Sequence, residues 1–312
     1  MIRHEFDIID HFFKQRAHHY PATTLGIGDD AAILKIPAEH ELVVTTDTLV
    51  NEIHFPANTD PYDIGVKSLA VNLSDLAAMG ATPAWITLAL TMPASDEKWL
   101  SAFSEGLFSL ANRYSIELIG GDLTKGPLSI TIGAMGLVPQ NKALRRSGAH
   151  AGDLIYVTHT IGDAALGLAS LQGKAILDPT SKAYAISKLN RPEPRIDIGI
   201  KLRDIATAAI DISDGLLQDL QHLLKNSQVG ATIITDHVPL SSALKLQAAP
   251  LEFALNGGDD YELLFTIPPG KKHLLDFDCT HIGIITEQVE SINIVYSDGK
   301  PYQHITHGYQ HF

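Results

Sequence analysis

Segments with the pattern of strands alternate with segments patterned as helices along almost the whole chain of 312 residues. This alternation is typical of α/β and α+β proteins, and it excludes a helical bundle and an all-β sandwich. The helix expected over residues 60–79 is the most sharply bounded, because Asp60 can act as its N-cap and Gly80 follows its end. At roughly 100–200 residues per domain, the chain is long enough for two domains.

A polar, glycine-containing stretch at residues 139–153 interrupts the alternation. We therefore expect an N-terminal domain over residues 1–140 and a C-terminal domain over residues 150–312. In the first half we expect helices near 4–15 and 60–79 and from Ser95 onward, and strands at 31–36, 42–46, 85–92, 116–119 and 128–138. In the second half we expect helices near 163–171, 182–189, 196–206 and 216–225, and strands at 154–158, 208–212, 231–234, 263–267, 281–286 and 292–296.

The composition is that of a folded protein, with 45% hydrophobic and 19% charged residues. No apolar run approaches the roughly 18 residues of a membrane span, and the first residues lack an apolar secretion signal. The single cysteine, Cys279, excludes an internal disulfide and a thiolate metal cluster. We therefore expect a protein of a reducing compartment, the cytoplasm.

The chain carries 36 acidic and 23 basic residues, a formal net charge of −13. Such a surface repels nucleic-acid phosphates and anionic membranes unless basic residues cluster, and no cluster extends beyond Arg145-Arg146. We therefore expect neither nucleic acid nor a membrane as partner. The acidic excess either serves solubility or collects divalent metal ions where acids gather.

Acidic residues accompany apolar segments at six places in the sequence. Taken alone, each element is most simply a turn, because Gly and Asp are preferred there. Asp75 differs, because helical spacing puts it in a polar line with Ser68 and Asn72, which is either a solvated face or one that contacts a metal or ligand. The six elements are residues 26–30 (GIGDD), 45–47 (TTD), Asp75, 120–122 (GGD), 211–215 (DISDG) and 257–262 (GGDDYE).

The aspartates of these elements would repel one another strongly if they met, since two charges about 4 Å apart cost roughly 4 kcal/mol at an effective dielectric near 20. Counter-cations make such a cluster tolerable, and all-oxygen ligands select Mg²⁺, Ca²⁺ or Mn²⁺. Mg²⁺ often bridges carboxylates to phosphates, and glycine backbone can approach phosphate oxygens closely. A magnesium–nucleotide site follows. The aspartates concerned are Asp30, Asp47, Asp75, Asp122, Asp211 and Asp214.

The familiar nucleotide-binding signatures are absent from the sequence. It contains no P-loop, no protein-kinase HRD or DFG set, and no G-x-G-x-x-G that opens a helix. Among the histidines, His54 is a candidate ligand because it closely follows the TTD element. The proline-containing residues 191–195 (RPEPR) are expected to connect two helices and nothing more.

Eight segments together closely resemble the thiamine-monophosphate kinase family, in the right order and over essentially the full length. They are GIGDDAA (26–32), TTDTLV (45–50), HF (54–55), AVNLSDLAAMGATPAW (70–85), IGGDLTKGPLSITIGAMG (119–136), RSGAHAGD (146–153), DISDGLLQDL (211–220) and GGDDYELLF (257–265). The final GYQHF (308–312) also resembles the aromatic C-terminal signature of that family. The resemblance implies the fold of aminoimidazole ribonucleotide synthetase. In that fold the sheet of an N-terminal α/β domain pairs with a second subunit to form a dimer barrel, and an α+β C-terminal domain follows.

The resemblance also implies an activity, the transfer of the γ-phosphoryl group of ATP to thiamine monophosphate. The metal ligands that it implies, for several Mg²⁺ ions, are Asp30, Thr45, Thr46, Asp47, Asp75, Asp122, Asp211 and Asp214. The ATP contacts that it implies are Gly121, Asp122, Arg146 and Ser213, and the thiamine monophosphate contacts are His54, Asp259 and Tyr309. The residues assigned to catalysis are Asp47, Asp122, Asp211 and Arg146.

One position departs from the family, which usually has Glu where this chain has Asp259. The acid is kept, but its reach is one methylene shorter. Phosphoryl transfer to a phosphate oxygen needs no strong general base, because it is promoted mainly by positioning and charge neutralisation. We therefore expect direct in-line transfer without a covalent phosphoenzyme, with Arg146 neutralising phosphate charge.

Related enzymes of the same fold are the nearest alternatives. A selenophosphate synthetase-like protein would need a reactive residue such as Cys near its N-terminus, and a hydrogenase-maturation relative would end in a cysteine; this chain has neither. A purine-pathway synthetase-like enzyme and a non-catalytic nucleotide-binding regulator remain. Turnover of ATP that depends on thiamine monophosphate separates them.

Overall fold

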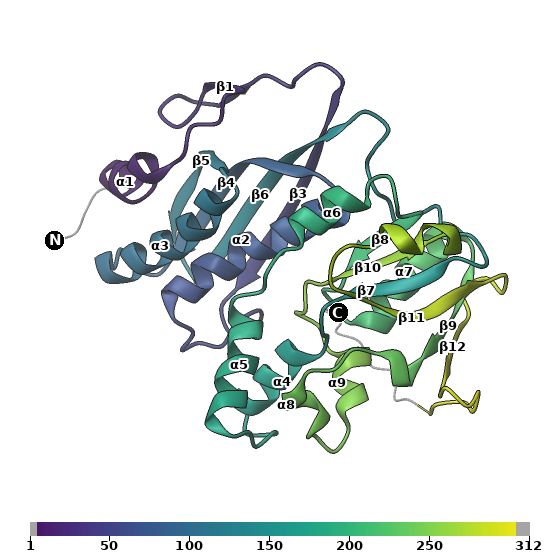
Figure 1. Cartoon of the computed structure of the whole chain (residues 1–312). Helices are drawn as coiled ribbons and strands as arrows, with labels where there is room; N and C mark the ends of the chain where they lie inside the picture. Colours follow the sequence, from purple (N-terminus) through teal and green to yellow (C-terminus); the bar gives the residue numbers. More distant parts are fainter. Residues whose placement is uncertain (1–4, 304–312) are drawn as a thin grey trace. The chain divides into compact units, whose positions relative to one another are not determined.

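The computed structural model describes residues 5–303. It divides into two compact units (Figure 1). Unit 1 comprises Met1–Leu76 and Ala81–Asn141, and unit 2 comprises Ala77–Gly80 and Lys142–Phe312. Both units combine a mixed sheet with helices, so the predicted two-domain α/β (α+β) fold class is confirmed.

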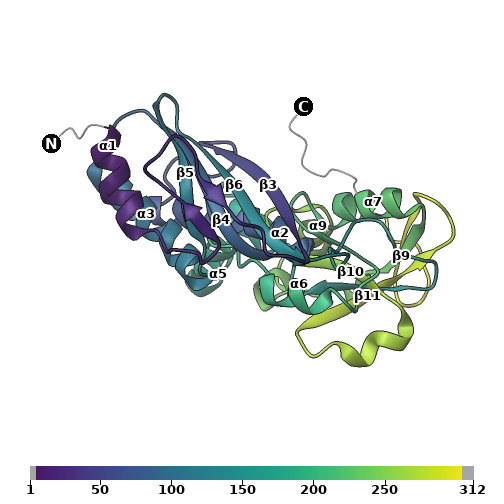
Figure 2. The same ribbon diagram turned by 90° about the horizontal axis from the view of Figure 1, so that it is seen from above.

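The described part of unit 1 contains a four-stranded sheet in the order β3 (His40–Val50), β6 (Ser129–Pro139), β4 (Thr82–Met92) and β5 (Glu117–Lys125). Strand β6 runs antiparallel to β3 and β4, and β4 runs parallel to β5. Helix α3 (Glu97–Arg113) connects the parallel pair, as a crossover between parallel strands requires. Figure 2 shows the four strands side by side in this order.

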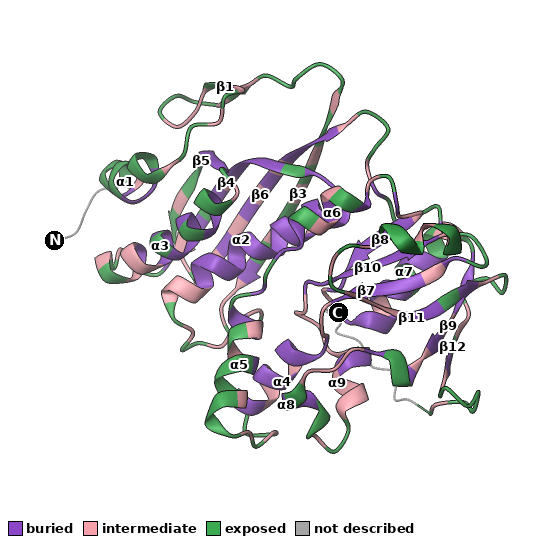
Figure 3. Ribbon diagram, in the orientation of Figure 1, coloured by how far each residue is buried: buried purple, intermediate pink, exposed green. Residues whose placement is uncertain are grey.

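Helix α2 (Pro61–Ala78) is buried on nearly all sides (Figure 3). The carboxylate of Asp60 accepts a hydrogen bond from the N–H of Tyr62, as expected of the residue that caps the helix. The side chains of Ser68 and Asn72 are 2% and 0% exposed. Two members of the polar line, Ser68 and Asn72, are therefore not on a solvated face, whereas the third, Asp75, is only partly buried.

Two glycines let α2 and α3 pack with their backbones in contact. A Cβ at Gly65 would lie 2.1 Å from the carbonyl oxygen of Phe103, and a Cβ at Gly106 would lie 2.0 Å from that of Tyr62. Any larger residue at either position would force the two helices apart.

Strand β3 forms one edge of the sheet, and its two faces differ. The side chains of Thr45 and Asp47 lie on one face of β3 and alternate with exposed residues, as the period of two along a strand dictates. The hydroxyl of Thr45 and the N–H of Asp47 donate hydrogen bonds to α2. On the opposite face, Leu42 and Val44 are 41% and 63% exposed. The sheet of unit 1 therefore presents apolar side chains to solvent on its edge strand.

The N-terminal segment of unit 1 is less regular than the single helix expected near residues 4–15. It consists of α1 (Glu5–Ile8), a π-helical turn (Ile9–Phe13) and a 3₁₀ turn (Lys14–Arg16), followed by the short strands β1 (Thr23–Leu25) and β2 (Ile33–Leu34). Buried hydrogen bonds anchor β1 to the main sheet, because Thr23 Oγ1 accepts from Trp85 Nε1 at 2.8 Å and donates to Glu117 Oε2 at 2.6 Å.

In the described part of unit 2, six strands form one sheet. Their order is β12 (Ile292–Val295), β9 (Gly230–Ile234), β11 (Cys279–Thr286), β7 (Leu154–Thr158), β10 (Leu263–Ile267) and β8 (Ala208–Asp211). Neighbouring strands are antiparallel except β12 and β9. Strand β8 thus forms an edge beside β10, and both strands adjoin acidic motifs.

In the described part of unit 2, six α-helices accompany this sheet, and all except the one at residues 196–202 contribute side chains to one apolar core. They are α4 (Asp163–Leu171), α5 (Pro179–Asn190), α6 (Ile196–Leu202), α7 (Leu216–Ser227), α8 (Ser242–Lys245) and α9 (Pro250–Asn256). Strands β7 and β10 and helix α4 begin and end at the predicted residues, whereas the short helices α8 and α9 were not predicted. In unit 1, Asp96 rather than Ser95 caps α3, since its carboxylate accepts from the N–H groups of Lys98 and Trp99.

Two acidic elements that the sequence presents as turns lie inside strands. Residues 45–47 are in the middle of β3, and residues 120–122 are in the middle of β5. Paired strands on one or both sides hold these polar residues extended. Within residues 5–303, no helix is both long and apolar enough to cross a membrane.

Candidate active site

Strand β3 and helix α2 bring three of the predicted metal ligands together in unit 1. Thr45 Oγ1 donates a 2.5 Å hydrogen bond to Asp75 Oδ2, and the N–H of Asp47 donates to Asn72 Oδ1 at 3.1 Å. Burial, and then the nearby Asp75 carboxylate, raise the pKa of Asp47 to about 6. A divalent cation bound by these groups would offset both effects, and Mg²⁺ accepts carboxylate and hydroxyl ligands.

Thr46 lies on the opposite face of β3 from its two neighbours, because successive side chains of a strand alternate. It is exposed, and its hydroxyl donates to the carbonyl of Ile132 at 3.1 Å. The structure therefore does not bring the side chain of Thr46 together with those of Thr45 and Asp47.

Strand β5 carries Gly121 and Asp122 beside β4. A Cβ at Gly121 would lie 1.8 Å from the carbonyl oxygen of Leu88, so the position requires glycine. Asp122 is exposed, and its Oδ2 accepts a 2.7 Å hydrogen bond from Thr124 Oγ1. At Gly120 a Cβ would meet no atom within 4 Å, so the exposed carboxylate of Asp122 lies two residues after a position with open backbone.

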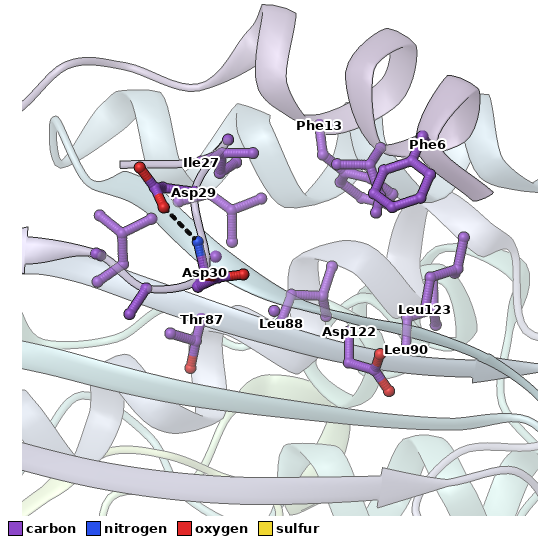
Figure 4. A pocket seen from close by; sticks show the side chains of 18 of the residues that line it. Phe6, Phe13, Ile27, Asp29, Asp30, Thr87, Leu88, Leu90, Asp122 and Leu123 are labelled. Carbon is purple, nitrogen blue, oxygen red and sulfur yellow. Dashed lines mark hydrogen bonds between the residues drawn. The ribbon is translucent and has the colours of Figure 1, made fainter. Parts of the chain in front are cut away.

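A pocket of about 680 Å³ lies within unit 1 and has an acidic part and an apolar part. Asp30 and Asp122 line its acidic part, and Figure 4 shows the rings of Phe6 and Phe13 lying across the pocket from Leu90. Asp30 is exposed, and its N–H donates to Asp29 Oδ1 at 2.9 Å. A volume of this size is within the range of about 300–1,000 Å³ that is usual for small-molecule sites.

In unit 2, the loop between β8 and α7 carries Asp211, Ser213 and Asp214. Asp211 is buried at the end of β8, and the two other residues are partly exposed. The Oδ2 atom of Asp219, in the first turn of α7, accepts hydrogen bonds of 3.0–3.1 Å from the N–H groups of Ser213, Asp214 and Gly215. Three consecutive N–H groups directed at one carboxylate oxygen fix the course of the loop.

The GGDDYE motif lies directly beside this loop. The N–H of Asp259 donates to the carbonyl of Ser213, and the N–H of Tyr261 donates to that of Ile212, both at 2.8 Å. Asp259 Oδ1 accepts a 3.1 Å hydrogen bond from the Tyr261 hydroxyl. A Cβ at Gly258 would lie 2.5 Å from the carbonyl oxygen of Ser213, so the two motifs meet where one has no side chain.

Two other acids of the motif are bound within unit 2. Asp260 Oδ2 accepts from the N–H of Gly162 at 2.7 Å, and Glu262, 2% exposed, forms a two-pronged ion pair with Arg195. The expectation that residues 191–195 only connect two helices is therefore wrong, because Arg195 is buried against the motif. Burial raises the pKa of Asp260 well above its usual range, and the nearby Glu262 and Asp163 add to that effect.

The three remaining predicted residues are placed as follows. His54, in unit 1, accepts a 2.9 Å hydrogen bond at Nδ1 from the N–H of Val50, and its carbonyl accepts one from the buried Lys67. Arg146, in unit 2, has an exposed side chain, and its carbonyl accepts from Ser227 Oγ. Tyr309 lies outside the described residues.

The predicted metal ligands divide between the units. Unit 1 holds Asp30, Thr45, Thr46, Asp47, Asp75 and Asp122, and unit 2 holds Asp211 and Asp214. Within residues 5–303, no group of three or more His, Cys, Asp or Glu side chains is placed so that it could hold a metal ion. The pair of Asp47 and Asp75 is brought together, and the larger cluster stays a prediction.

Sequence reasoning assigned no role to Asp219 or Arg195. A signal for Asp219 exists, because an acid in the first turn of a helix often accepts hydrogen bonds from the N–H groups that precede it. For Arg195 there is no local signal, since its partner Glu262 is 67 residues away.

Two domains of a known protein family match two successive parts of the chain. Residues 28–138 match the N-terminal domain of AIR synthase related proteins, and residues 150–292 match the C-terminal domain of the same family. The thiamine-monophosphate kinase of Escherichia coli K12 is 48% identical over 319 residues, covering 99% of this chain and 98% of that protein. The enzyme of Bacillus subtilis is 35% identical, covering 99% of both chains.

Solved structures agree with these matches. A crystal structure of thiamine-monophosphate kinase from Stenotrophomonas maltophilia K279a superposes with a TM-score of 0.86 at 45% identity, covering 97% of this chain and 99% of the other. A structure described as AaThiL complexed with AMPPCP and TMP superposes with a TM-score of 0.79 at 32% identity, covering 100% and 99%. The chain therefore belongs to the thiamine-monophosphate kinases, within the family of AIR synthase related proteins.

Proposed function

We propose that this protein transfers the γ-phosphoryl group of ATP to thiamine monophosphate, producing thiamine diphosphate and ADP. The observation that carries the proposal is the 48% identity to a thiamine-monophosphate kinase over nearly the full length of both chains. The AaThiL complex supports it further, because that related protein was solved with AMPPCP, an analogue of ATP, together with TMP.

The pocket of unit 1 supports a nucleotide site. Phe13 and Leu90 offer apolar surface for a base, while Asp30 and Asp122 line the acidic part. Near Asp122, the backbone at Gly120 lines the pocket and is open to phosphate oxygens, because a Cβ there would meet no atom within 4 Å. Because carboxylates repel phosphates, such a pocket needs a cation between them. We assign Ser213 and Arg146 of unit 2 as further ATP contacts.

The donor groups fit Mg²⁺. Thr45, Asp47 and Asp75 supply oxygen ligands, and the raised pKa of Asp47 is the shift that a bound cation would reverse. Asp30, Asp122 and the backbone at Thr46 in unit 1, with Asp211 and Asp214 in unit 2, complete the proposed set. When bound, Mg²⁺ neutralises charge on the phosphoryl oxygens and so permits two anions to approach each other.

We propose direct in-line transfer. A phosphate oxygen of thiamine monophosphate forms a bond to the γ-phosphorus while the bond to the β,γ-bridging oxygen breaks, and ADP leaves with that electron pair. The acceptor oxygen is already ionised near neutral pH, so the protein needs no strong base. The exposed guanidinium of Arg146 can pair with phosphate oxygens through two parallel hydrogen bonds.

Thiamine monophosphate recognition is assigned to His54, Asp259 and Tyr309. Asp259 offers a carboxylate that can face the cationic thiazolium, and its side chain is held by the Tyr261 hydroxyl. An aromatic ring at Tyr309 suits the same cation or the pyrimidine.

We also propose a homodimer and a cytoplasmic location. The exposed Leu42 and Val44 on edge strand β3 support an interface, since apolar side chains on an edge strand favour pairing with another chain. The single cysteine is compatible with a reducing compartment. Light scattering of Val44→Asp should report a monomer, and an unchanged mass would contradict this interface.

The function is tested by turnover. Purified protein with ATP, Mg²⁺ and thiamine monophosphate should yield thiamine diphosphate and ADP in equal amounts, and excess EDTA should abolish the reaction. Omission of thiamine monophosphate should stop ADP formation and leave no label on the protein from γ-labelled ATP. ATP consumption that does not depend on thiamine monophosphate would overturn the assignment, and chaseable label on the protein would replace direct transfer with two steps.

A further inference from the structure

The segment between helices α5 and α6 ends in a buried arginine. Arg195 is 9% exposed, and it occupies the N-cap position of α6. Its Nε donates to Glu262 Oε2 at 2.7 Å, and its Nη2 donates to Glu262 Oε1 at 2.5 Å. This two-pronged geometry holds the carboxylate in one orientation, which a lysine in the same place could not do.

Glu262 connects this arginine to both loops of the candidate site in unit 2. Its Oε2 also accepts from the hydroxyl of Thr158, which in turn accepts from the N–H of Leu263. Its carbonyl accepts from the N–H of Ile212 at 2.8 Å. The residue that Arg195 fixes is thus bonded to the loop that carries Ser213 and Asp214.

The segment that precedes Glu262 has an unfavourable backbone. Asp259 and Tyr261 both have positive φ angles, 69° and 52°, in a region that residues other than glycine seldom occupy. Such conformations persist when the surroundings over-determine them. Here the constraints are the Arg195–Glu262 pair on one side, and the bonds from Asp259 and Tyr261 to the neighbouring loop on the other.

We infer that Arg195 is a positioning residue for acceptor recognition: through Glu262 it holds Asp259 where the acceptor's cation binds. The inference rests on the proposed function for the identity of the acceptor. Arg195 itself contacts neither substrate, and it acts on Asp259 through Glu262. Its loss therefore weakens binding of thiamine monophosphate most. Binding of ATP changes less, because its pocket lies in unit 1 and only the proposed contact Ser213 adjoins the loop that Glu262 bonds.

Three variants and a control test the inference. Arg195→Met removes the ion pair with Glu262, and Arg195→Lys keeps the positive charge but not the two parallel hydrogen bonds. The double variant Arg195→Met/Glu262→Met removes both partners, so that no carboxylate is left buried alone. Arg203→Met is the matched control, because Arg203 is another arginine of unit 2 that is at least partly buried, with Nε donating to the carbonyl of Gly80.

The kinetic readout is the Michaelis constant for each substrate. Arg195→Met and the double variant should raise the constant for thiamine monophosphate by about 10- to 100-fold, the range usual when the partner that orients a functional group is removed. The constant for ATP should change less than about twofold, and Arg195→Lys should fall in between. Arg203→Met should leave both constants unchanged.

Hydrogen exchange tests the positioning without any substrate. In the double variant the amides of Asp259 and Tyr261 should exchange faster, while those in β10 keep their protection. Unchanged exchange at these two amides overturns the inference, as does an equal rise of both Michaelis constants. If Arg195→Met does not fold, the lysine and double variants decide.

The inference and the proposed function can fail separately. A wild-type protein that does not phosphorylate thiamine monophosphate contradicts the proposed function, whereas the exchange of the two amides still decides whether Arg195 holds the loop. A normal wild-type activity with unaffected variants contradicts the inference alone.

Discussion

In unit 1 the acids of the candidate site lie on strands β3 and β5, on helix α2 and in the bend at Asp30. In unit 2 several acids are instead bound to backbone amides or to an arginine. Asp47 has its pKa raised by burial and by a second carboxylate, and Asp122 is exposed. Burial and then Asp214 also raise the pKa of Asp219, to about 7, but its carboxylate accepts hydrogen bonds from three N–H groups, and Glu262 pairs with Arg195. The same residue types therefore suit an external cation in one unit and stabilise loops in the other.

The largest loss of turnover is expected at Asp47, an acid whose charge we propose is balanced by a bound cation. Asp47→Asn should lower turnover by about 1,000-fold or more, because it removes a ligand for the ion that neutralises the phosphoryl group. Its thermal stability in EDTA should equal or exceed that of the wild type, since the substitution removes a charge that burial and Asp75 disfavour. Turnover with Mg²⁺ and melting in EDTA check the two parts.

Asp178→Ala supplies a control for this contrast in unit 2. Asp178 is an exposed acid whose carboxylate caps α5 by accepting from Thr180 and Ser181. We expect it to lose about 1 kcal/mol of stability and no activity. Asp47→Asn with near-normal turnover would remove the distinction between the units.

A smaller loss of turnover is expected from changes at Asp219, which holds the loop of residues 213–215. Asp219→Ala leaves the three N–H groups of residues 213–215 without their acceptor, which should cost about 1–3 kcal/mol of stability. Because the loop carries Ser213 and Asp214, turnover should fall by about 10- to 100-fold. Asp219→Asn keeps an acceptor oxygen and should lose less in both measurements. Equal losses for the two variants would show that charge, and not loop geometry, is the contribution of this residue.

The contrast between the units could be predicted from the sequence only in part. The alternating pattern gave the bounds of β7, β10 and α4, because caps and apolar periodicity are local signals. It ended the two strands at residues 46 and 119, although β3 continues to Val50 and β5 to Lys125, since Gly, Thr and Asp in succession resemble a turn. Pairing of β3 with β6, and of β4 with β5, overrides that local preference.

The roles of individual acids depend on contacts between distant residues. The bond from Gly162 to Asp260 spans 98 positions, and that from Arg195 to Glu262 spans 67. No spacing in the sequence distinguishes Asp259, which has the assigned substrate role, from Asp260 beside it. The sequence therefore predicts which motifs carry the chemistry, but it does not predict which acid of a motif points into the protein.

The third prediction separates these two neighbours. Asp259→Asn should raise the Michaelis constant for thiamine monophosphate by about tenfold, because a charge-assisted contact to the thiazolium is lost. ATP dependence should change little, as the pocket residues of unit 1 are untouched. Steady-state kinetics with each substrate varied in turn provide the measurement. Equal losses for both substrates would mean that Asp259 serves the metal or the nucleotide.

The smallest effect is expected at Asp260, and it depends on pH. Burial, with Glu262 and Asp163 nearby, raises the pKa of Asp260 in the folded protein far above that of the unfolded chain, although hydrogen bonds from Gly162 and Ala164 offset part of the shift. The folded state thus binds more protons than the unfolded state between about pH 4 and the folded pKa, so this group lowers the free energy of unfolding as pH rises through that window. Asp260→Asn keeps the acceptor for Gly162 and removes the titration. In EDTA, its melting temperature should be nearest to that of the wild type near pH 4 and should exceed it increasingly up to pH 8.5, by about 2–4 °C for each kcal/mol relieved. A constant difference in melting temperature between the two proteins across this range would show that Asp260 is ionised in the folded protein. The contrast between the acids of the two units would then not extend to Asp260.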